Sequence, residues 1–516
     1  MGVLLGLDLG TSTVKAVAFD PAVGEVVRIA SRPTPVEHPC PNWSQFDPGR
    51  LWAAAAACLR EAAEGLKVEG LAISSMGEVG LPLDAHHRPL YPLVAWYDRR
   101  AVSQVNEWEA CFPPEIQHAI SGQRVNPSFG VIKWLWFRHN HPQRAKRMAH
   151  WLSLPDYILW LLTGAQVTDY SIASRTLLFD QRRLDWSQEL LTAAGLRHHQ
   201  LPPVAVAGTR AGNLTAKAAQ QTGLPSGLPC ALGGHDHLCA AFAAGAIRPG
   251  VVVDSIGTAE ALVMVLPGFY TGEAFARRSF ACYAHVVAGF YVLKAGINTA
   301  GGALEWAVRR LAGCEDPQLE PPYAELEAEA QASLGQEVGP LWLPHWNGSG
   351  SPEADRFSRA AMIGARLHHR RGDLLRGLFE SLAFWSRRNL AEMQALTGQP
   401  VQRLVVSGGA SRLKLLLQLK SDVLNLPVEL PDLPESAALG AALLAGIGMG
   451  YFANPQEALA SLRYDSQVFL PDGERAAWYD RLYCRVYLPL YDALKEVHHA
   501  MAELAGEKDP PAPEDV

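Results

Sequence analysis

The chain has 516 residues, of which 48% are hydrophobic and 19% are charged, and its formal net charge is −7. This length exceeds what one hydrophobic core usually supports, so we expect at least two globular domains. The negative charge gives no reason to expect a nucleic acid or an anionic membrane as a partner. No stretch resembles a signal peptide or a membrane span, and the eight cysteines are scattered without a Cys-x-x-Cys pair. These features predict a cytoplasmic protein with reduced thiols.

Short apolar runs separated by polar turns open the chain and predict an α/β fold. The strands expected in the first half lie at residues 3–8, 14–20, 25–30 and 71–75. Helical patterns follow at residues 48–63, 129–137 and 154–162. Asp47 and Pro48 are a typical N-cap and first-turn pair for the first of these helices. Residues 151–200 read as a mixed, loop-rich region and as a candidate insertion.

The second half repeats this order of elements. Strands are expected at 251–255, 262–265, 290–294 and 404–407, and helices at 303–311, 374–396 and 413–424. Asp-Leu-Gly-Thr in the first half and Asp-Ser-Ile-Gly-Thr in the second form a weak internal repeat, which predicts two related α/β lobes. The expected divisions are an N-terminal lobe at 1–247, a C-terminal lobe at 248–490, and a terminal helix with a disordered tail at 491–516.

The turn after the first strand carries phosphate-binding chemistry. Asp8 ends the strand, Gly10 permits a tight turn, and the amides and hydroxyls of Thr11 and Ser12 are donors, with Lys15 as a nearby cation. Such a hairpin can hold phosphate oxygens while the carboxylate reaches a hydrated magnesium ion. The alternative is a polar hairpin turn that binds nothing.

Asp236 lies between two histidines at the start of a predicted helix. After Gly233 and Gly234 there is room for a substrate against the backbone, and a carboxylate fixed there can take a proton from an alcohol. His235 and His237 also invite a metal interpretation. Their spacing does not match a helical His-x-x-x-His site, however, and no second cluster completes a zinc site in the sequence.

Two further segments suit ligand binding. Ser407-Gly408-Gly409-Ala410-Ser411 follows a strand and opens a helix, which favours close approach by a nucleotide, although packing glycines in a plain strand-to-helix turn explain it as well. Glu78 and Trp96-Tyr97-Asp98-Arg99-Arg100 combine acids with a tryptophan, as in sites for polyhydroxy compounds. Solvated loop acids beside a core tryptophan are the alternative.

The ordered set of these motifs resembles the FGGY carbohydrate kinases, members of the actin-like ATPase superfamily. The motifs are Asp-Leu-Gly-Thr-Ser-Thr, Trp-x-Asp-x-Arg, Gly-Gly-x-Asp, Gly-Thr, and Gly-Gly-Ala-Ser followed by Gln418 and Asp422, and the resemblance covers Gly6 to about Gly450. It implies two actin-like (ribonuclease H-like) lobes with an interdomain cleft, ATP and Mg2+ as cofactors, and a small-molecule sugar or polyol as the substrate. Family members are often dimers, so a homodimer is possible.

The resemblance also implies roles for particular residues. It makes Asp236 the general base and Asp8 a holder of magnesium. The residues implied to face the phosphates are Gly10, Thr11, Ser12, Lys15, Gly257 and Thr258. Those implied to lie against the nucleotide are Gly408, Gly409, Ala410, Ser411 and Gln418. The sugar pocket is expected to contain Glu78, Trp96, Asp98, Arg100, His235, Asp236 and His237.

The chain departs from the glycerol kinase pattern in its sugar-binding segments. Ser75-Met76-Gly77-Glu78-Val79 keeps the acid but lacks the arginine of glycerol kinases, and it equally lacks the Gln-Met-His of xylulokinases. Ser128 and Ala261 stand where glycerol kinases carry a tyrosine and a phenylalanine. These differences disfavour glycerol and leave a ketopentose, a pentitol or a tetritol as the expected acceptor.

Two other classes of protein stay open alongside a kinase. A non-kinase actin-like ATPase would share both phosphate turns but would lack Trp96, Asp98 and Asp236 as a set. A catalytically silent sugar-binding regulator would need a damaged base or phosphate turn, and neither is visible in the sequence.

Overall fold

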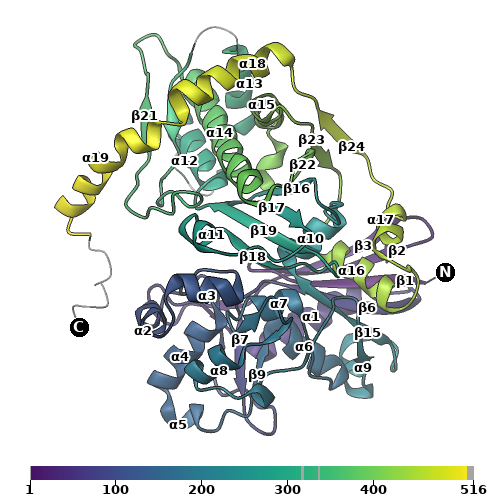
Figure 1. Ribbon diagram of the computed structural model, residues 1–516. Helices are drawn as coiled ribbons and strands as arrows, with labels where there is room; N and C mark the ends of the chain where they lie inside the picture. Colours follow the sequence, from purple (N-terminus) through teal and green to yellow (C-terminus); the bar gives the residue numbers. More distant parts are fainter. Residues whose placement is uncertain (1, 315, 317–318, 335–337, 508–516) are drawn as a thin grey trace.

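Two mixed β-sheets organise the chain in the computed structural model, which describes residues 2–314, 316, 319–334 and 338–507 (Figure 1). The first sheet has the strand order β14-β15-β6-β1-β2-β3. Its strands are β1 (Val3–Leu9), β2 (Thr13–Asp20), β3 (Glu25–Pro33), β6 (Val68–Ser75), β14 (Arg210–Asn213) and β15 (Pro229–His235). β1, β6 and β15 run parallel, whereas β2 is antiparallel to both β1 and β3.

The second sheet repeats this topology with strands from later in the chain. Its order is β18-β19-β17-β16-β22-β23-β24. The strands are β16 (Val251–Ile256), β17 (Glu260–Leu266), β18 (Ala281–Ala284), β19 (Tyr291–Ile297), β22 (Arg403–Ser407), β23 (Val428–Pro431) and β24 (Ser466–Phe469). β16, β22 and β23 run parallel, and β17 is antiparallel to both β16 and β19. The shared order confirms the two related α/β lobes that the internal repeat predicts.

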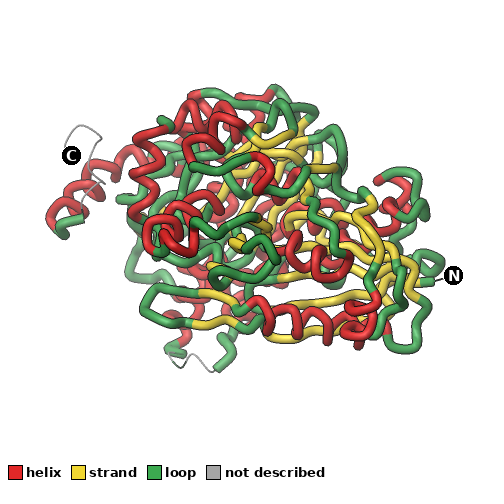
Figure 2. The backbone as a smooth tube through the Cα atoms, turned by 90° about the horizontal axis from the view of Figure 1, so that it is seen from below, coloured by secondary structure: helices red, strands yellow, loops and turns green. Residues whose placement is uncertain are grey.

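The elements expected from hydrophobic periodicity are present, with ends shifted by a few residues. The main helices around the sheets are α1 (Pro48–Ala63), α12 (Gly301–Ala312), α14 (Arg371–Thr397) and α15 (Lys414–Leu424). Figure 2 shows that helices surround the strands. α1 begins as the sequence predicts, because the Asp47 carboxylate accepts a hydrogen bond from the Arg50 amide at 2.8 Å and Pro48 occupies the first turn.

Helix α16 (Ser436–Gly448) lies on the first sheet although it follows most of the second sheet in the sequence. It packs against β1, β6 and β15 and against α10 (Asp236–Ala243). Glycines allow this close approach: a Cβ atom at Gly6 would lie 1.8 Å from the Ala438 carbonyl oxygen, and one at Gly440 would lie 2.0 Å from that of Cys239. The helix therefore packs against both the strand that carries Asp8 and the helix that Asp236 begins.

Residues between β7 (Gly80–Leu83) and β14 add a separate core beside the first sheet. This core contains large aromatic side chains, among them Trp108, Phe129 and Trp186. The mixed region expected at 151–200 contains the helix predicted at 154–162 and two short α-helices that the sequence did not indicate. They are α6 (Leu154–Thr163), α7 (Tyr170–Ser174) and α8 (Gln188–Ala194).

The chain ends in helix α19 (Leu490–Leu504), which extends from the side of the molecule in Figure 1. The tail predicted to be disordered lies largely at residues 508–516, outside the described residues. The boundary at residue 247 stays a prediction. In the part of the chain that the structure describes, no helix is both long enough and apolar enough to span a bilayer.

Replacing Gly440 by alanine should destabilise the fold, because the added Cβ meets the backbone of α10 and one of the two helices has to move. We expect the free energy of unfolding to fall by about 1–3 kcal/mol. Gly473→Ala is the matched control, since no atom lies within 4 Å of its added Cβ, and it should change stability by less than about 0.5 kcal/mol. Urea denaturation of both variants gives the comparison. Equal stability of the two variants would contradict this account of the α10–α16 contact.

Candidate active site

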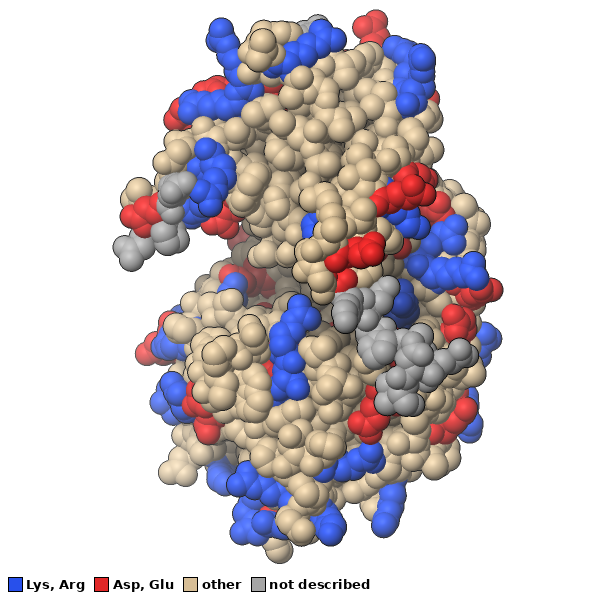
Figure 3. Space-filling view, turned by 90° about the vertical axis from the view of Figure 1, so that its left-hand side faces the viewer, with Lys and Arg blue, Asp and Glu red and all other residues tan. Residues whose placement is uncertain are grey.

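The carboxyl ends of the parallel strands in the first sheet bring two acids together. Asp8 lies near the end of β1, and Asp236 begins α10 directly after β15. Only β6 separates these two strands in the sheet. Figure 3 shows that the surface is hollowed between the upper and the lower part of the molecule, in keeping with the interdomain cleft that the fold implies.

The Asp8 carboxylate has one hydrogen-bond donor, the Ser74 hydroxyl, at 3.0 Å. Burial, together with repulsion from Asp236, raises the pKa of Asp8 to about 7. A divalent cation beside these two acids would offset both the repulsion between the carboxylates and the cost of removing them from water. Among the described residues no group of three His, Cys, Asp or Glu side chains is placed to hold a metal ion. A magnesium ion at Asp8 would therefore rely on water and phosphate oxygens for its other ligands, as is usual for this ion.

The Asp236 carboxylate is oriented by its immediate neighbours. Its Oδ1 atom accepts a hydrogen bond from the His237 amide at 2.6 Å and lies 3.3 Å from His235 Nε2. Burial raises the pKa of Asp236 to about 7, against the lowering effect of the His237 amide. A quarter of the side chain remains exposed, so a ligand can reach it. These are properties of a carboxylate that can accept a proton near neutral pH.

The two histidines that flank Asp236 are neutral near pH 7. Burial lowers the pKa of His237 to about 3 and lowers that of His235 well below its ordinary value. Their rings lie 5.3 Å apart, and the His235 amide donates to the Ser171 hydroxyl at 2.9 Å. Both therefore offer uncharged hydrogen-bonding groups beside the acid.

Glu78 faces Arg175, a residue that sequence analysis missed. Arg175 Nε donates to the Glu78 carboxylate at 2.8 Å, a second guanidinium nitrogen also pairs with it, and a third bonds Gln123. The main chain of Glu78 is also held, because Lys133 Nζ donates a hydrogen bond to the Glu78 carbonyl oxygen at 3.0 Å. Arg175 follows α7, 97 residues away in sequence, so no local pattern pairs it with Glu78.

The first phosphate turn is a tight hairpin between β1 and β2. The Gly10 amide donates to the Thr13 carbonyl oxygen at 3.1 Å, and the Thr11 hydroxyl accepts a hydrogen bond from Trp96 Nε1 at 2.9 Å. Ser12 is exposed. Lys15 is not free in this structure, because its ammonium group pairs with the Glu435 carboxylate at 2.6 Å. Glu435 is a second residue that the sequence did not indicate.

The second turn, with Gly257 and Thr258, joins β16 to β17 at the equivalent place in the second sheet. Both residues are exposed, and the turn is braced by the start of α12, where the Gly301 amide donates to the Gly257 carbonyl oxygen at 3.0 Å. Beneath it lies a buried ion triad: Lys420 Nζ lies 2.5 Å from the Asp254 carboxylate and 2.6 Å from that of Glu260. This triad was also missed by sequence reasoning.

The predicted nucleotide segment follows β22, the strand next to β16. Gly408 has a φ of +93°, and a Cβ there would lie 2.6 Å from the Ile256 carbonyl oxygen, so the turn requires glycine. Gly409 has no atom within 4 Å of an added Cβ, and Ala410 is half-buried, whereas the Ser411 hydroxyl bonds back to the Gly408 carbonyl oxygen at 2.7 Å. Gln418 lies further along and donates its amide to Asp422 and to the Leu470 carbonyl oxygen.

The Trp96–Arg100 segment divides into an exposed part and a buried part. Trp96 is 41% exposed beside the first phosphate turn. Asp98 and Arg100 instead form a buried pair, with Nε and Nη2 of the guanidinium 2.9 Å from the two carboxylate oxygens and no exposed side-chain surface. The guanidinium also lies over the Trp43 ring, 4.2 Å from its centroid. The structure therefore does not bring Asp98 and Arg100 to the surface where a sugar binds.

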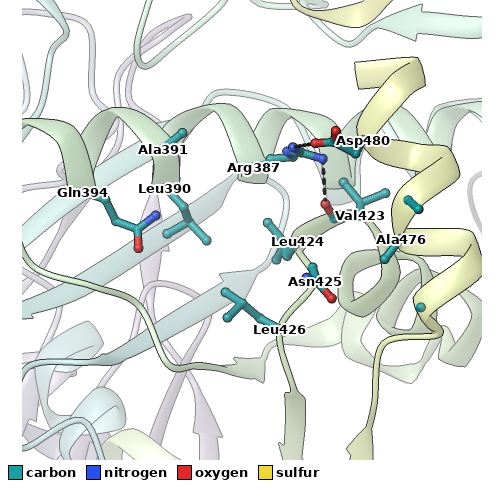
Figure 4. A pocket seen from close by; sticks show the side chains of 12 residues that line it. Arg387, Leu390, Ala391, Gln394, Val423, Leu424, Asn425, Leu426, Ala476 and Asp480 are labelled. Carbon is teal, nitrogen blue, oxygen red and sulfur yellow. Dashed lines mark hydrogen bonds and ion pairs between the residues drawn. The ribbon is translucent and has the colours of Figure 1, made fainter. Parts of the chain in front are cut away.

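A separate cavity of about 620 Å³ lies on the second lobe between α14, the end of α15 and α18 (Gly473–Leu482) (Figure 4). Arg387 spans it to Asp480 and to the Val423 carbonyl oxygen. None of the residues predicted for catalysis or binding lines this cavity. This cavity is therefore separate from the predicted site around Asp8 and Asp236.

Comparisons with known proteins agree on one family. The sequence profiles of the FGGY family of carbohydrate kinases match residues 3–243 with the N-terminal domain and residues 268–449 with the C-terminal domain. The chain is 32% identical over 490 residues to a glycerol kinase of Gloeobacter violaceus (92% of this chain, 93% of that protein) and 30% identical over 480 residues to an L-fuculokinase of Escherichia coli (92% and 98%). The crystal structure of a xylulose kinase from Rhodospirillum rubrum has a TM-score of 0.88, at 30% identity, covering 96% of this chain and all of that one.

Replacing Arg100 by methionine should leave the Asp98 carboxylate buried without its cation. We expect the free energy of unfolding to fall by about 3–5 kcal/mol, the usual cost of removing one partner of a buried ion pair. The neighbouring Arg99 is exposed, so Arg99→Met should cost less than about 0.5 kcal/mol. Urea denaturation measures both. A small loss for Arg100→Met would refute the structural role assigned to the pair.

Proposed function

This chain belongs to the FGGY family of carbohydrate kinases, and we propose that Asp236 is the general base in its transfer of a phosphoryl group to a hydroxyl. The protein is a phosphotransferase that acts on an alcohol group of a small sugar or polyol and uses ATP with Mg2+. The observation that carries the proposal is the place of Asp236, whose partly exposed carboxylate is close enough to repel Asp8 and is oriented by the His237 amide.

The transfer step places defined demands on the site. The acceptor hydroxyl oxygen forms a bond to the γ-phosphorus, the bond from that phosphorus to the β–γ bridging oxygen breaks, and the hydroxyl proton passes to Asp236. Positioning of the hydroxyl and stabilisation of charge supply most of the rate enhancement. With a pKa of about 7, Asp236 is ionised in a large share of the molecules at neutral pH, so it can accept the hydroxyl proton as the bond to phosphorus forms.

We propose that the phosphates of ATP lie between the two turns. Gly10, Thr11 and Ser12 supply amides and hydroxyls from the first lobe, and Gly257 and Thr258 supply them from the second. Lys15 reaches the phosphates when it exchanges its bond with Glu435 for a phosphate oxygen. Magnesium held near Asp8 supplies charge neutralisation for the transferring group. Two lobes around one site also suit closure that excludes water.

The nucleotide itself is proposed to lie along the second lobe. Gly408 and Gly409 let it approach the backbone, since Gly409 has open space where a side chain would be. Ala410 and Ser411 continue this surface. Gln418 is the least supported member of the set, because its amide is already bonded to Asp422 and Leu470.

We propose an acceptor pocket that consists of Glu78, Trp96, His235, Asp236 and His237. The acids accept hydrogen bonds from the acceptor's hydroxyls, and the neutral imidazoles form further hydrogen bonds with these hydroxyls. The exposed tryptophan covers the apolar face of the carbon chain. Asp98 and Arg100, expected in the pocket from the sequence, are left out because they bind each other. Arg175 acts through Glu78, whose carboxylate it orients.

The acceptor is proposed to be larger than glycerol. A ketopentose, a pentitol or a tetritol fits the replacement of two aromatic positions of glycerol kinases by Ser128 and Ala261, which leaves more room for the carbon chain. A silent regulator or a non-kinase ATPase gains no support, because both phosphate turns and the base are intact.

Replacing Asp236 by asparagine should abolish most of the acceptor-dependent turnover while leaving the fold intact. Loss of a general base typically costs about 10²–10⁴-fold in rate. The variant should keep its affinity for Mg·ATP, and at pH 8 it should unfold at an equal or higher urea concentration, because asparagine avoids the cost of an ionised buried carboxylate. Turnover within a factor of three of the wild-type value would remove the assignment.

The rate should depend on pH through the raised pKa of Asp236. Since a base must be unprotonated, kcat/KM for the acceptor should rise with pH up to about 7 and level off above it, falling about tenfold per unit well below that value. Higher Mg2+ should move the rise to lower pH, because a cation bound near Asp236 favours the ionised form of its carboxylate. A profile that is flat from pH 5 to 8, at fixed Mg2+, would contradict this account.

A further inference from the structure

Lys294, in the second lobe, is a cation that forms no ion pair with any carboxylate in the described part of the chain. Its side chain is half-buried in β19, and its ammonium group has no hydrogen-bond or ion-pair partner among the described residues. The other cation nearby is satisfied, since Arg175 is bonded to Glu78 and Gln123. A half-buried ammonium without a partner carries a desolvation cost that a bound anion would offset.

Strand register places Lys294 on the sheet face that looks toward the acceptor pocket. Residues paired across antiparallel strands share a face, as do residues two apart along one strand. Lys294 pairs with Val263, and Val292, two residues before it, pairs with Tyr283. Val263, Val292 and Tyr283 all belong to the core that contains Leu238 and Phe242 of α10, the helix that Asp236 begins.

Tyr283 marks where this face meets the first lobe. Its ring lies 5.2 Å from the Arg175 guanidinium carbon and 6.4 Å from the His235 ring. Electrostatics agree with this placement. Burial and then Arg175 lower the pKa of Lys294, whereas Glu78 and Asp236 raise it. The Lys294 ammonium thus shares its surroundings with the acids of the acceptor pocket.

The second phosphate turn lies at the start of β17, which pairs with β19 further along that strand than Lys294. Glu260, directly after the turn, pairs with Ile297, which is three residues beyond Lys294 along β19. Three strand residues span about 10 Å. Glu78 and Asp236, by contrast, are the acids that raise the pKa of Lys294 against the lowering by burial. Lys294 is therefore nearer to the groups proposed to bind the acceptor than to those proposed to bind phosphate.

Small residues leave space beside Lys294. Ala261 pairs with Gly296, which lies two residues after Lys294 on the same face of β19. Neither residue has a side chain long enough to reach the ammonium group. A ligand that enters the acceptor pocket from the Asp236 side can therefore extend along this face toward Lys294.

We propose that the acceptor is a polyhydroxy acid, whose carboxylate binds the Lys294 ammonium while a hydroxyl distant from the carboxylate faces Asp236. This inference rests on the proposed function and keeps its chain length: the acceptor is the four- or five-carbon acid formed when one terminal carbon of a tetritol or pentitol is oxidised. A carboxylate offers an ammonium both charge and several acceptor lone pairs, which a neutral polyol does not. The carboxylate takes no part in the transfer.

The test compares each four- and five-carbon acid with its neutral alditol in acceptor-dependent ADP release. The wild-type enzyme should use at least one acid with a kcat/KM at least about tenfold above that of the alditol. Lys294→Met should lower kcat/KM for that acid by about tenfold to a hundredfold through KM, with the KM for ATP unchanged, and Lys294→Arg should restore part of the loss. Lys217→Met, which removes an exposed lysine of α9 (Ala216–Thr222), is the matched control and should behave as wild type.

Other results would overturn the inference in distinguishable ways. If neutral sugars or alditols are phosphorylated and none of the acids is, the carboxylate proposal fails while the kinase function stands. If an acid is used but Lys294→Met raises the KM for ATP instead of the KM for the acid, then Lys294 binds the γ-phosphate and the assignment fails. If no acceptor of either kind stimulates ADP release, the proposed function fails and this inference fails with it.

Discussion

The proximity of two half-buried acids is the constraint around which the rest of this structure is arranged. Asp8 and Asp236 lie at the ends of strands β1 and β15, separated by β6, and each has a pKa raised to about 7. Holding them there is costly in the absence of a ligand, because two carboxylates repel each other where water is scarce. The glycine contacts of α16 with β1 and α10 provide the rigid support that such a site needs. In the proposed function, magnesium near Asp8 and a proton accepted by Asp236 would relieve this repulsion.

The lobes divide the chemistry between them. In the proposed assignment the first lobe supplies the base, the first phosphate turn and most of the acceptor pocket, whereas the second supplies the other phosphate turn and the surface for the nucleotide. This division is not complete, because the Tyr283 ring of the second sheet lies beside Arg175 and His235 of the first lobe. If the acceptor is recognised from both lobes, then its binding and closure of the cleft are coupled. Positioning by closure is a common way for kinases to protect the phosphoryl group from water.

Much of this arrangement could be predicted from the sequence, and the exceptions have a physical reason. Hydrophobic periodicity and the Asp-Leu-Gly-Thr and Asp-Ser-Ile-Gly-Thr turns predicted two related α/β lobes, and the strand order of the two sheets confirms them. The residues proposed as the base and the two phosphate turns form local motifs, so the sequence alone could indicate them. Arg175 and Glu435 could not, because each meets its partner across a long sequence separation. Asp98 and Arg100 were expected to bind a sugar, and only the fold reveals that they bind each other.

Acceptor-dependent ADP release by the full-length wild-type chain is the most direct test of the central claim, because it measures sugar-stimulated phosphoryl transfer itself. The measurement would be made with Mg·ATP across ketopentoses, pentitols, tetritols and the corresponding acids, with the phosphorylated product identified by mass. The account predicts that at least one acceptor raises ADP release well above the rate without acceptor and yields one phosphorylated product per ADP. ADP release that no acceptor stimulates, or that yields only inorganic phosphate, would contradict it.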